Sequence, residues 1–129
     1  MRLLLDTHVA IWALVSPELI PDRLASLIAD ADNEVFVSAA SIWEIGIKFV
    51  LGKASAPPFS AKQAVSYFAE AGFISLPVTA VHAAAVEDLP PLHADPFDRM
   101  LIAQAISEPL RLISHDARVA AYGSMVLGW

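Results

Sequence analysis

The residues Leu3-Leu4-Leu5-Asp6-Thr7-His8 place a short apolar run immediately before an acid near the start of the chain. Three leucines in a row are long enough for a short buried strand, and Asp6 marks where that strand ends. Further along, β-branched and apolar runs predict four more strands, at Val35–Val37, Ile74–Val78, Leu112–Ser114 and Met125–Leu127. These five runs are expected to form one sheet.

Segments with helical spacing or helix-end signals lie between these runs. The predicted helices are Val9–Leu14, the segment around Leu24–Ile28, Ser38 to Gly52, the segment opened by Ser60 and Gln63, Thr79–Glu87, Asp95 to Ile106, and Ala117–Tyr122. Strands that alternate with helices predict the α/β class, with a mostly parallel central sheet and helices on both of its faces. In such a sheet the functional crevice lies beyond the carboxyl ends of the strands, so the chemistry is expected there.

The composition limits the class of protein. The chain has 129 residues, of which 57% are hydrophobic and none is cysteine, which predicts a single domain over residues 1-129 and excludes a disordered chain, a disulfide scaffold and a thiolate metal site. Apolar runs such as Val9–Val15 are far shorter than the roughly 20 residues of a membrane span, and Asp6 and His8 interrupt any signal peptide. We therefore expect a cytoplasmic protein. Its low charged fraction of 17% indicates that some apolar surface meets a partner.

Five acids lie at or near places where one crevice could gather them: Asp6, Glu44, Asp95, Asp98 and Asp116. Setting these five aside leaves 9 of the 14 acids against 8 bases, so much of the net charge of −6 belongs to one candidate site. Clustered carboxylates repel one another, and oxygen ligands favour a hard divalent cation such as Mg²⁺ or Mn²⁺. Such ions activate water in phosphodiester hydrolysis, and their charge would let an acidic protein bind RNA or DNA.

Each acid also has a structural interpretation. Glu44 could cap a helix, because Ser41-Ile42-Trp43-Glu44 matches a capping box. Asp95-Pro96-Phe97-Asp98 has the form of an N-cap followed by a first-turn proline and acid, so capping is the favoured role of Asp95 and an equal alternative for Asp98. Asp116 could cap the helix that follows it. Asp6 is harder to explain structurally, because an unpaired charge at the end of a buried strand is costly.

Rival catalytic patterns are missing from the sequence. The four histidines lack the spacing of a helical zinc pair, although His8 and His93 lie near the expected crevice and could contact a substrate. Ser114-His115-Asp116 cannot form a triad because neighbours in the chain cannot point at one another, and no Gly-rich phosphate loop occurs. A haloacid-dehalogenase-like phosphatase would carry an acid at the position of His8. A response-regulator receiver would carry a late lysine, whereas the last lysine here is Lys62.

Two bases lie beside the candidate acids: Lys48 one helical turn after Glu44, and Arg99 directly after Asp98. Each is expected to form a local ion pair or, alternatively, to hold a substrate phosphate. The aromatic residues interpreted as core or interface side chains, in preference to base-stacking platforms, are Trp12, Trp43 and Tyr67.

Four segments of the chain together carry a family resemblance. They are Leu3–His8, Ser38-Ala39-Ala40-Ser41-Ile42-Trp43-Glu44-Ile45, Asp95-Pro96-Phe97-Asp98-Arg99-Met100-Leu101-Ile102-Ala103-Gln104-Ala105, and Ile113-Ser114-His115-Asp116. In this order they resemble the PIN domain, and within it the VapC-type toxins of bacterial toxin–antitoxin pairs. The resemblance covers essentially the whole chain, and its motifs are specific in combination.

The resemblance implies a Mg²⁺- or Mn²⁺-dependent ribonuclease with a three-layer α/β/α fold. Its acidic quartet falls on Asp6, Glu44, Asp98 and Asp116. Asp6 and Asp98 are then the principal metal ligands. Glu44 is a ligand or a base that orients water, and Asp116 is a ligand of a more weakly held ion. Thr7 steadies the site through its hydroxyl.

Asp95 is additional to the quartet, and Asp98 takes the third position because the segment Arg99–Ala105 follows it as in the family. Asp116 falls on the family's most variable position. The partners implied by the resemblance are an RNA substrate, a second copy of the chain in a homodimer, and a small antitoxin that inserts a basic or aromatic side chain into the active site.

Two other functions fit the same acids. A non-catalytic PIN-like binding module would use its acidic pocket to receive a basic partner peptide, with no metal requirement. A metal-dependent nuclease acting on DNA would use the same carboxylates, but the small size of the chain and its lack of a basic arm favour RNA.

Overall fold

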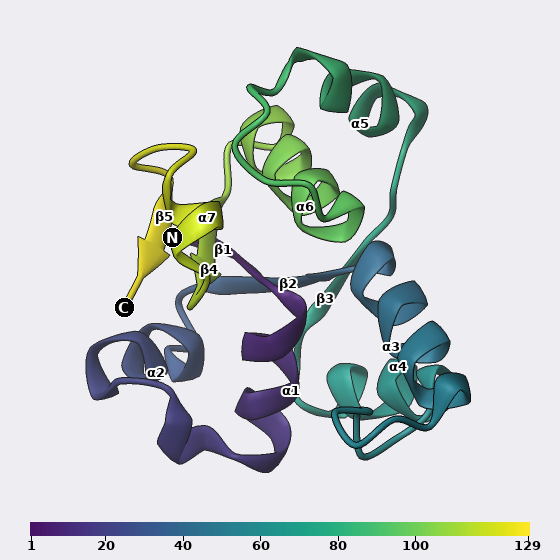
Figure 1. Ribbon diagram of the computed structural model, residues 1–129. Coiled ribbons are helices and arrows are strands. Elements are labelled where there is room, and N and C mark those ends of the chain that lie inside the picture. The colour runs from purple at the N-terminus through teal and green to yellow at the C-terminus, as the bar shows by residue number, and fades with distance from the viewer.

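The computed structural model describes residues 1–129, and Figure 1 shows a central sheet with helices on either side of it. The strands are β1 (Arg2–Leu5), β2 (Glu34–Ser38), β3 (Ile74–Leu76), β4 (Arg111–Ser114) and β5 (Val126–Gly128). The helices are α1 (Thr7–Val15), α2 (Asp22–Ala29), α3 (Ala39–Leu51), α4 (Ala61–Glu70), α5 (Ala80–Ala85), α6 (Pro96–Ser107) and α7 (Ala117–Ala120), with 3₁₀ turns at Pro17–Leu19 and Val86–Asp88. The predicted α/β class and the helices on both faces of the sheet are confirmed.

All five strands are parallel, in the order β3-β2-β1-β4-β5. The apolar run that opens the sequence forms the central strand, where Leu5 pairs with Val37 on one side and Ile113 on the other. From β1 the chain turns towards β2 and β3, and it later returns to place β4 and β5 on the opposite side of β1. The boundary between β1 and β4 is therefore the point where the strand order reverses, which is where open α/β sheets form their crevices.

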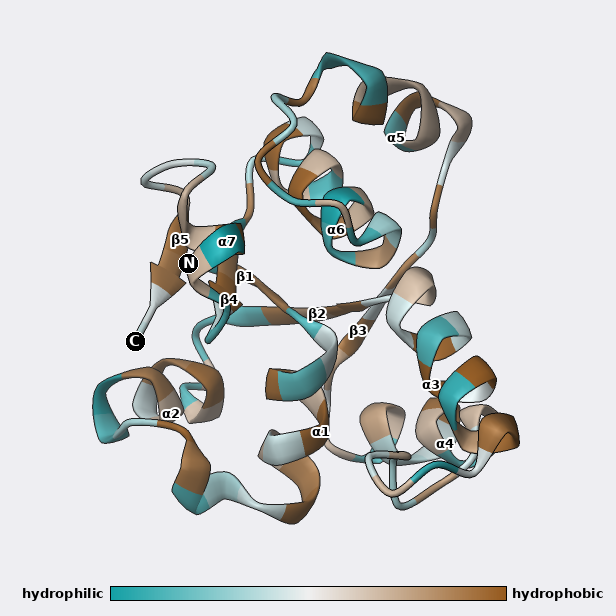
Figure 2. Cartoon of the chain, viewed as in Figure 1, coloured by the Kyte–Doolittle hydropathy of each residue, from teal (hydrophilic) through white to brown (hydrophobic).

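Side chains of successive residues in each strand enter two separate cores, because neighbours in a strand point to opposite faces. One core contains Leu3, Leu5, Val35, Val37 and Ile113, packed against α1, α2, α3 and α4. The other contains Leu4, Phe36 and Leu112, packed against α6 and α7. Figure 2 shows predominantly hydrophobic strands between helices of mixed character. These are the three layers, α/β/α, that the resemblance implied.

Helix boundaries follow local signals that are readable in the sequence. The Ser38 hydroxyl accepts the N–H of Ala40 at the start of α3, and Gly52 ends this helix in the left-handed conformation with φ of 64°. Ser60 and Gln63 form the predicted capping box of α4. These predictions are confirmed by the structure.

Several predicted segments differ in extent. The third strand ends at Leu76 rather than Val78, since Pro77 has no N–H to donate. The segment predicted as one helix over Thr79–Glu87 is α5 followed by a 3₁₀ turn. The last strand begins one residue later than predicted, and α7 ends at Ala120 rather than Tyr122. None of the helices combines the length and the apolar character that crossing a membrane requires.

Candidate active site

Asp6 lies where β1 ends and α1 begins. Its main-chain N–H donates to the carbonyl of Ile113 in β4, which continues the pairing of the two strands by one residue (3.0 Å). Its carboxylate Oδ1 accepts the N–H of Val9 at 2.8 Å and so caps α1. The carboxyl is almost wholly buried, at the point where the strand order reverses.

This burial raises the pKa of Asp6 to about 6, because the ionised form loses its contact with water. The Ser114 hydroxyl and the N–H of Val9 oppose the shift by hydrogen bonding to the carboxylate, and the positive charge of His8 also opposes it. The negative charge of Asp98 adds to the rise. A cation near Asp6 would oppose both the effect of burial and that of the neighbouring negative charge.

Asp98 is presented by the first turn of α6, and Asp95 makes that possible. The Asp95 Oδ1 accepts the N–H groups of Phe97 (2.9 Å) and Asp98 (3.0 Å), which is the N-cap geometry predicted for Asp95. Because Asp95 caps the helix, the Asp98 side chain is not needed as a cap. Burial raises the pKa of the Asp98 carboxyl, and the charges of Asp95 and Glu44 raise it further, while His93 opposes the rise.

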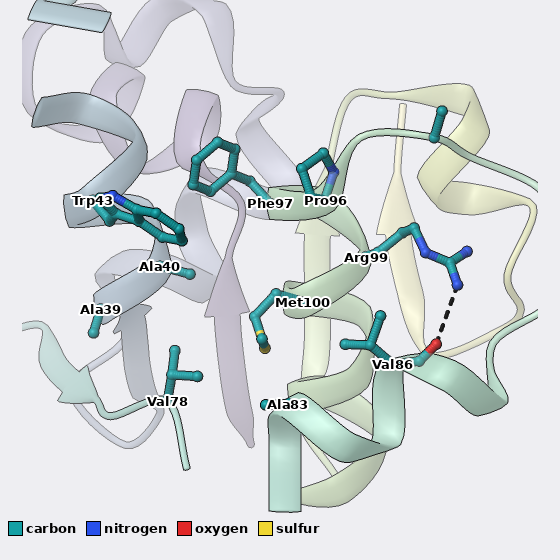
Figure 3. Close-up of a pocket in the computed structure, with 11 residues that line it drawn as sticks. Ala39, Ala40, Trp43, Val78, Ala83, Val86, Pro96, Phe97, Arg99 and Met100 are labelled. Carbon is teal, nitrogen blue, oxygen red and sulfur yellow. Dashed lines mark hydrogen bonds between the residues drawn. The ribbon is translucent and has the colours of Figure 1, made fainter. Parts of the chain in front are cut away.

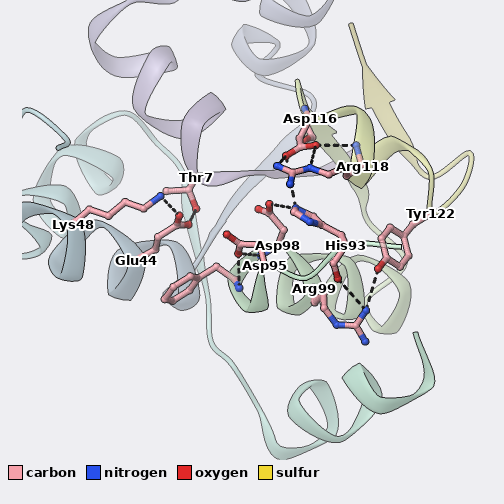
Figure 4. Close-up of polar contacts among 12 residues, drawn as sticks. Thr7, Glu44, Lys48, His93, Asp95, Asp98, Arg99, Asp116, Arg118 and Tyr122 are labelled. Atoms are coloured by element: carbon pink, nitrogen blue, oxygen red, sulfur yellow. Dashed lines mark hydrogen bonds and ion pairs between the residues drawn. The ribbon is translucent and has the colours of Figure 1, made fainter. Parts of the chain in front are cut away.

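His93 joins the third and fourth acids of the quartet (Figure 4). Its Nε2 lies 2.7 Å from Asp98 Oδ2 and 3.7 Å from Asp116 Oδ2. The side chain is buried, and its Nδ1 has no hydrogen-bond partner. Nε2 is therefore the ring nitrogen that donates to the Asp98 carboxylate.

Asp116 lies just after β4 and caps α7. Its Oδ1 accepts the N–H of Arg118 at 2.8 Å, and the Arg118 guanidinium reaches Oδ2 at 3.1 Å. These bonds lower the pKa of the Asp116 carboxyl, in contrast to the raised values of Asp6 and Asp98. Asp116 is thus an ionised, partly exposed acid whose charge is already balanced in part by an arginine.

Glu44 lies on the opposite flank of the site, in the second turn of α3. The Thr7 hydroxyl donates to Glu44 Oε1 at 2.6 Å and lies 2.9 Å from the Ser41 hydroxyl, and Lys48 pairs with Oε2 at 2.5 Å (Figure 4). The capping-box interpretation of Glu44 is wrong, because α3 begins at Ala39 with Ser38 as its cap. Lys48 forms the local ion pair that was one of its two predicted roles.

Arg99 points away from the carboxylates. Its guanidinium donates to the carbonyls of Val86 (3.1 Å) and Pro90 (3.1 Å) and to the Tyr122 hydroxyl (3.0 Å), and that hydroxyl donates to Pro90 as well. The expected ion pair with Asp98 is not formed, because the guanidinium is bonded to these groups instead. Arg99 fixes the loop before α6, the loop that carries His93.

The structure brings one ligand atom each of His93, Asp98 and Asp116 within 4.8 Å of one another. Asp6 and Glu44 are not part of this group: Asp6 lines a hollow with Asp116, and Glu44 is held by the Thr7 hydroxyl. The carboxylate oxygens of these acids fit a hard divalent cation, and burial raises the pKa of two of the acids, Asp6 and Asp98. His93 serves Asp98 as a hydrogen-bond donor, as the outer partners of metal-binding groups commonly do. Its closeness to Asp98 and Asp116 was not predicted, and neither were the contributions of Ser41 and Ser114.

A model of the PIN domain matches residues 3–124, and the chain belongs to this family. PIN domains are generally nucleases and typically use a divalent metal, so membership supports a hydrolase of the nuclease class. The acidic group at Asp98 and Asp116 is a possible metal-binding site in this chain. A search of curated proteins returned no match.

Several solved structures share the fold. VapBC2 from Rickettsia felis, bound to a DNA fragment from its promoter, matches with a TM-score of 0.70 and 15% identity, covering 100% of this chain and 99% of that one. DNA-bound VapBC from Salmonella typhimurium matches with a TM-score of 0.69, 16% identity and coverage of 100% and 98%. VapBC-5 from Mycobacterium tuberculosis is a member of the VapBC family of toxin–antitoxin systems. It matches with a TM-score of 0.62 and 21% identity, covering 98% of this chain and 96% of that one. At these identities the matches establish a shared architecture.

Proposed function

We propose that this PIN domain is a Mg²⁺- or Mn²⁺-dependent endoribonuclease that acts in the cytoplasm as the toxin of a toxin–antitoxin pair. The observation that carries the proposal is the gathering of three acids beside the central strand: Asp6 and Asp116 line one open hollow, and carboxylate oxygens of Asp98 and Asp116 lie within 4.8 Å of each other. A cation bound among these acids would activate a water molecule and stabilise the leaving oxygen of a phosphodiester. Its charge would also let RNA approach a chain of net charge −6.

The remaining residues have roles that follow from their contacts. Asp6 and Asp98 would hold the principal ion, and Asp116 would contribute to a more weakly held one. Glu44, whose Oε1 accepts from the Thr7 hydroxyl, would orient the attacking water once Lys48 releases Oε2. These assignments use each carboxylate in the environment that the structure gives it.

An apolar cavity of about 610 Å³ between α3, α5 and α6 supports the proposal of an antitoxin partner (Figure 3). Trp43, Phe97 and Met100 line it, and Phe97 is the immediate neighbour of Asp98. A partner segment with an apolar side chain in this cavity could place a basic side chain among the carboxylates. Such a segment would block the site by contacts that the VapBC architecture leads us to expect.

The homodimer is proposed on a different surface, which we call the α3 surface. It consists of Ile47, Val50 and Leu51, exposed apolar side chains on one face of α3, with Val50 84% exposed. Monomeric proteins seldom leave such residues clustered in water. We propose that residues 1–129 form one domain and that two copies meet through this surface.

Calorimetric titration of Mg²⁺ and Mn²⁺, combined with cleavage of an RNA pool, tests the nuclease proposal. We expect the wild-type chain to bind a divalent ion and cleave RNA, and Asp6→Asn and Asp98→Asn to lose both properties while remaining folded. Asp32→Asn, an exposed acid in the turn before β2, is the matched control and should behave as wild type. RNA cleavage that persists in Asp6→Asn, or that continues after the metal is removed, would overturn the mechanism.

The binding-module alternative has one observation in its favour: Lys48 and Arg118 already pair with Glu44 and Asp116, so basic side chains fit at these carboxylates. A wild-type chain that binds a Lys- or Arg-rich peptide tightly in the presence of a chelator, and cleaves no RNA with either metal, would favour this function. A chain that cleaves RNA would exclude it.

A further inference from the structure

An open hollow at the carboxyl edge of the sheet joins the acids to a group of aromatic rings. Two acids, Asp6 and Asp116, line it together with the rings of His8, Trp12 and His115. The rings come from α1 and from the loop between β4 and α7, so the hollow lies at the same strand reversal as the candidate metal site. We call it the aromatic hollow.

The rings of the aromatic hollow are ordered by contacts with one another. The Trp12 ring centre lies 5.9 Å from that of His115 and 6.0 Å from that of His8. His115 stacks on Trp129 with centres 4.7 Å apart and planes inclined by 23°, and its Nδ1 contacts the main-chain oxygen of Trp129 at 2.7 Å. The imidazole is therefore held at a fixed angle, with Nδ1 donating to the main-chain oxygen.

The composition and exposure of the hollow distinguish it from a core. His8 and His115 are exposed and Trp12 is only half-buried, whereas the cores under the sheet are built from fully buried aliphatic side chains. Two imidazoles and an indole beside an arginine also differ from the apolar cavity at Trp43, which suits a protein segment. Flat polar rings at an open edge are what an unstacked nucleobase requires.

Charge in the hollow fits the same ligand. Arg118 lines it with a side chain that is 67% exposed, and its guanidinium is held on Asp116. A guanidinium has several N–H donors in a fork, so Arg118 could keep its contact with Asp116 and donate to a phosphate as well. Proteins that bind single strands combine such a cation with stacking rings, and a ring accepts any base because every base has a flat face.

We propose that the aromatic hollow is a nucleobase subsite, in which the base beside the scissile phosphate of a single-stranded RNA stacks on the exposed ring of His115 while Arg118 contacts the adjoining phosphate. Trp12, whose ring plane is inclined by 60° to that of His115, would contact the edge of the base. The proposal rests on the proposed nuclease function and extends it, because it names single-stranded RNA with an unstacked base as the substrate class. Duplex RNA, whose bases are already stacked, would not fill the hollow.

Two RNA probes measure the contribution of the base. One is a fluorescein-labelled single-stranded 12-nucleotide pool of random sequence, and the other is the same ribose-phosphate backbone without bases. Binding is followed by fluorescence anisotropy in Ca²⁺, and cleavage of the pool in Mg²⁺ or Mn²⁺. The variants are His115→Ala, which removes an exposed ring, His115→Phe and Trp12→Phe, which keep a stacking surface, and Tyr67→Ala as a control on α4, with thermal melts confirming that each is folded.

Removal of one stacking ring should weaken binding of the base-containing pool about tenfold. We expect His115→Ala to show this loss as a higher KM with an unchanged kcat, and to bind the base-free backbone as wild type does. His115→Phe and Trp12→Phe should retain most of the affinity, and Tyr67→Ala all of it. Equal effects of His115→Ala on both probes, or no effect on either, would overturn the subsite. A wild-type chain that cleaves no RNA would instead overturn the nuclease function, so the two failures are distinguishable.

Discussion

At the scale of single residues, the site depends on carboxyls that are costly to ionise where they lie. Asp6 is buried at the end of the central strand, and its two hydrogen bonds do not offset the loss of water, so its pKa rises to about 6. Asp116, with a guanidinium bonded to it, shows the opposite shift. A divalent cation would therefore stabilise the ionised form of Asp6 far more than that of Asp116. Asp6 is the more informative position to change.

The raised pKa of Asp6 predicts that the metal-free chain loses stability as the pH rises. Below pH 3.8 the group is protonated in both the folded and the unfolded chain. Between 3.8 and about 6 the unfolded chain releases the proton first, so the free energy of unfolding falls as the pH rises, and the loss is complete above the folded value. The expected loss is on the order of 3 kcal/mol relative to Asp6→Asn.

Urea unfolding in a chelator, measured at pH 4, 5, 6 and 7, gives this difference directly. Asp6→Asn keeps an oxygen that can accept the N–H of Val9 but has no proton to release, so comparison with it at each pH isolates the contribution of Asp6. Added Mg²⁺ or Mn²⁺ should restore stability to the wild-type chain at pH 7 and not to the variant. A difference between the two chains that stays constant with pH would contradict the prediction.

His93 is predicted to act on the metal through Asp98. Its Nε2–H occupies Asp98 Oδ2 and leaves the other oxygen to face an ion, and loss of such an outer hydrogen bond typically lowers metal affinity by 10- to 100-fold. We expect this loss in His93→Ala and in His93→Asn, whose shorter amide does not reach Asp98. His93→Gln places an amide nitrogen near the Nε2 position and should restore most of the affinity, as measured by calorimetry. Equal affinities in His93→Asn and His93→Gln would exclude this role.

At the scale of helices and strands, local signals were sufficient to predict the element types and most helix ends. Ser38, the Ser60–Gln63 pair and Asp95 all act through hydrogen bonds to residues two or three positions away, so their patterns are visible in the chain itself. Glu44 shows the limit of such reasoning, because the Ser41 pattern competes with a true cap at Ser38. A pattern alone does not state which of two neighbouring caps the backbone adopts.

The arrangement of the site was only partly predictable, because some of its contacts join residues that are far apart in the sequence. Strand ends in a parallel sheet meet at one edge, so Asp6 and Asp116 could be expected near each other from the order of runs in the sequence. The contact of His93 with Asp98 depends instead on a loop whose path is fixed by Arg99 and Tyr122. Arg99 lies in α6 and Tyr122 in the turn after α7, so no local spacing relates them.

The end of α3 offers a stability test that leaves the site alone. Gly52 has a φ of 64° and no atom within 4 Å of the position that a Cβ would occupy, so a substitution there meets strain but no clash. We expect Gly52→Ala to lower the free energy of unfolding by about 1 kcal/mol. Gly52→Asn should cost less, because asparagine tolerates this conformation. Metal affinity should be unchanged in both, and a stability of Gly52→Ala equal to wild type would contradict the assignment of this cap.

At the scale of the whole molecule, the distribution of apolar surface separates the proposed contacts. The α3 surface faces outward at the far end of α3, the apolar cavity lies between α3 and α6, and the aromatic hollow lies at the β1–β4 boundary. Only 17% of the residues are charged, so the chain has few means of keeping these regions in water. Each region has a composition suited to a different partner: a second copy, an antitoxin segment and an RNA base.

The α3 surface provides the last prediction, because its residues are exposed enough to be changed without disturbing the fold. Val50 has the most exposed side chain of the surface, and a dimer through this region would bury it. Val50→Glu would then place an unpaired charge in an apolar interface and raise the dimer dissociation constant by roughly a hundredfold. Sedimentation velocity should show a dimer for the wild-type chain and a monomer for Val50→Glu, both with the same thermal stability per chain at high dilution. Leu19→Glu introduces the same charge at a half-exposed leucine outside α3 and should remain dimeric, so dissociation of both variants would assign the dimer to another face.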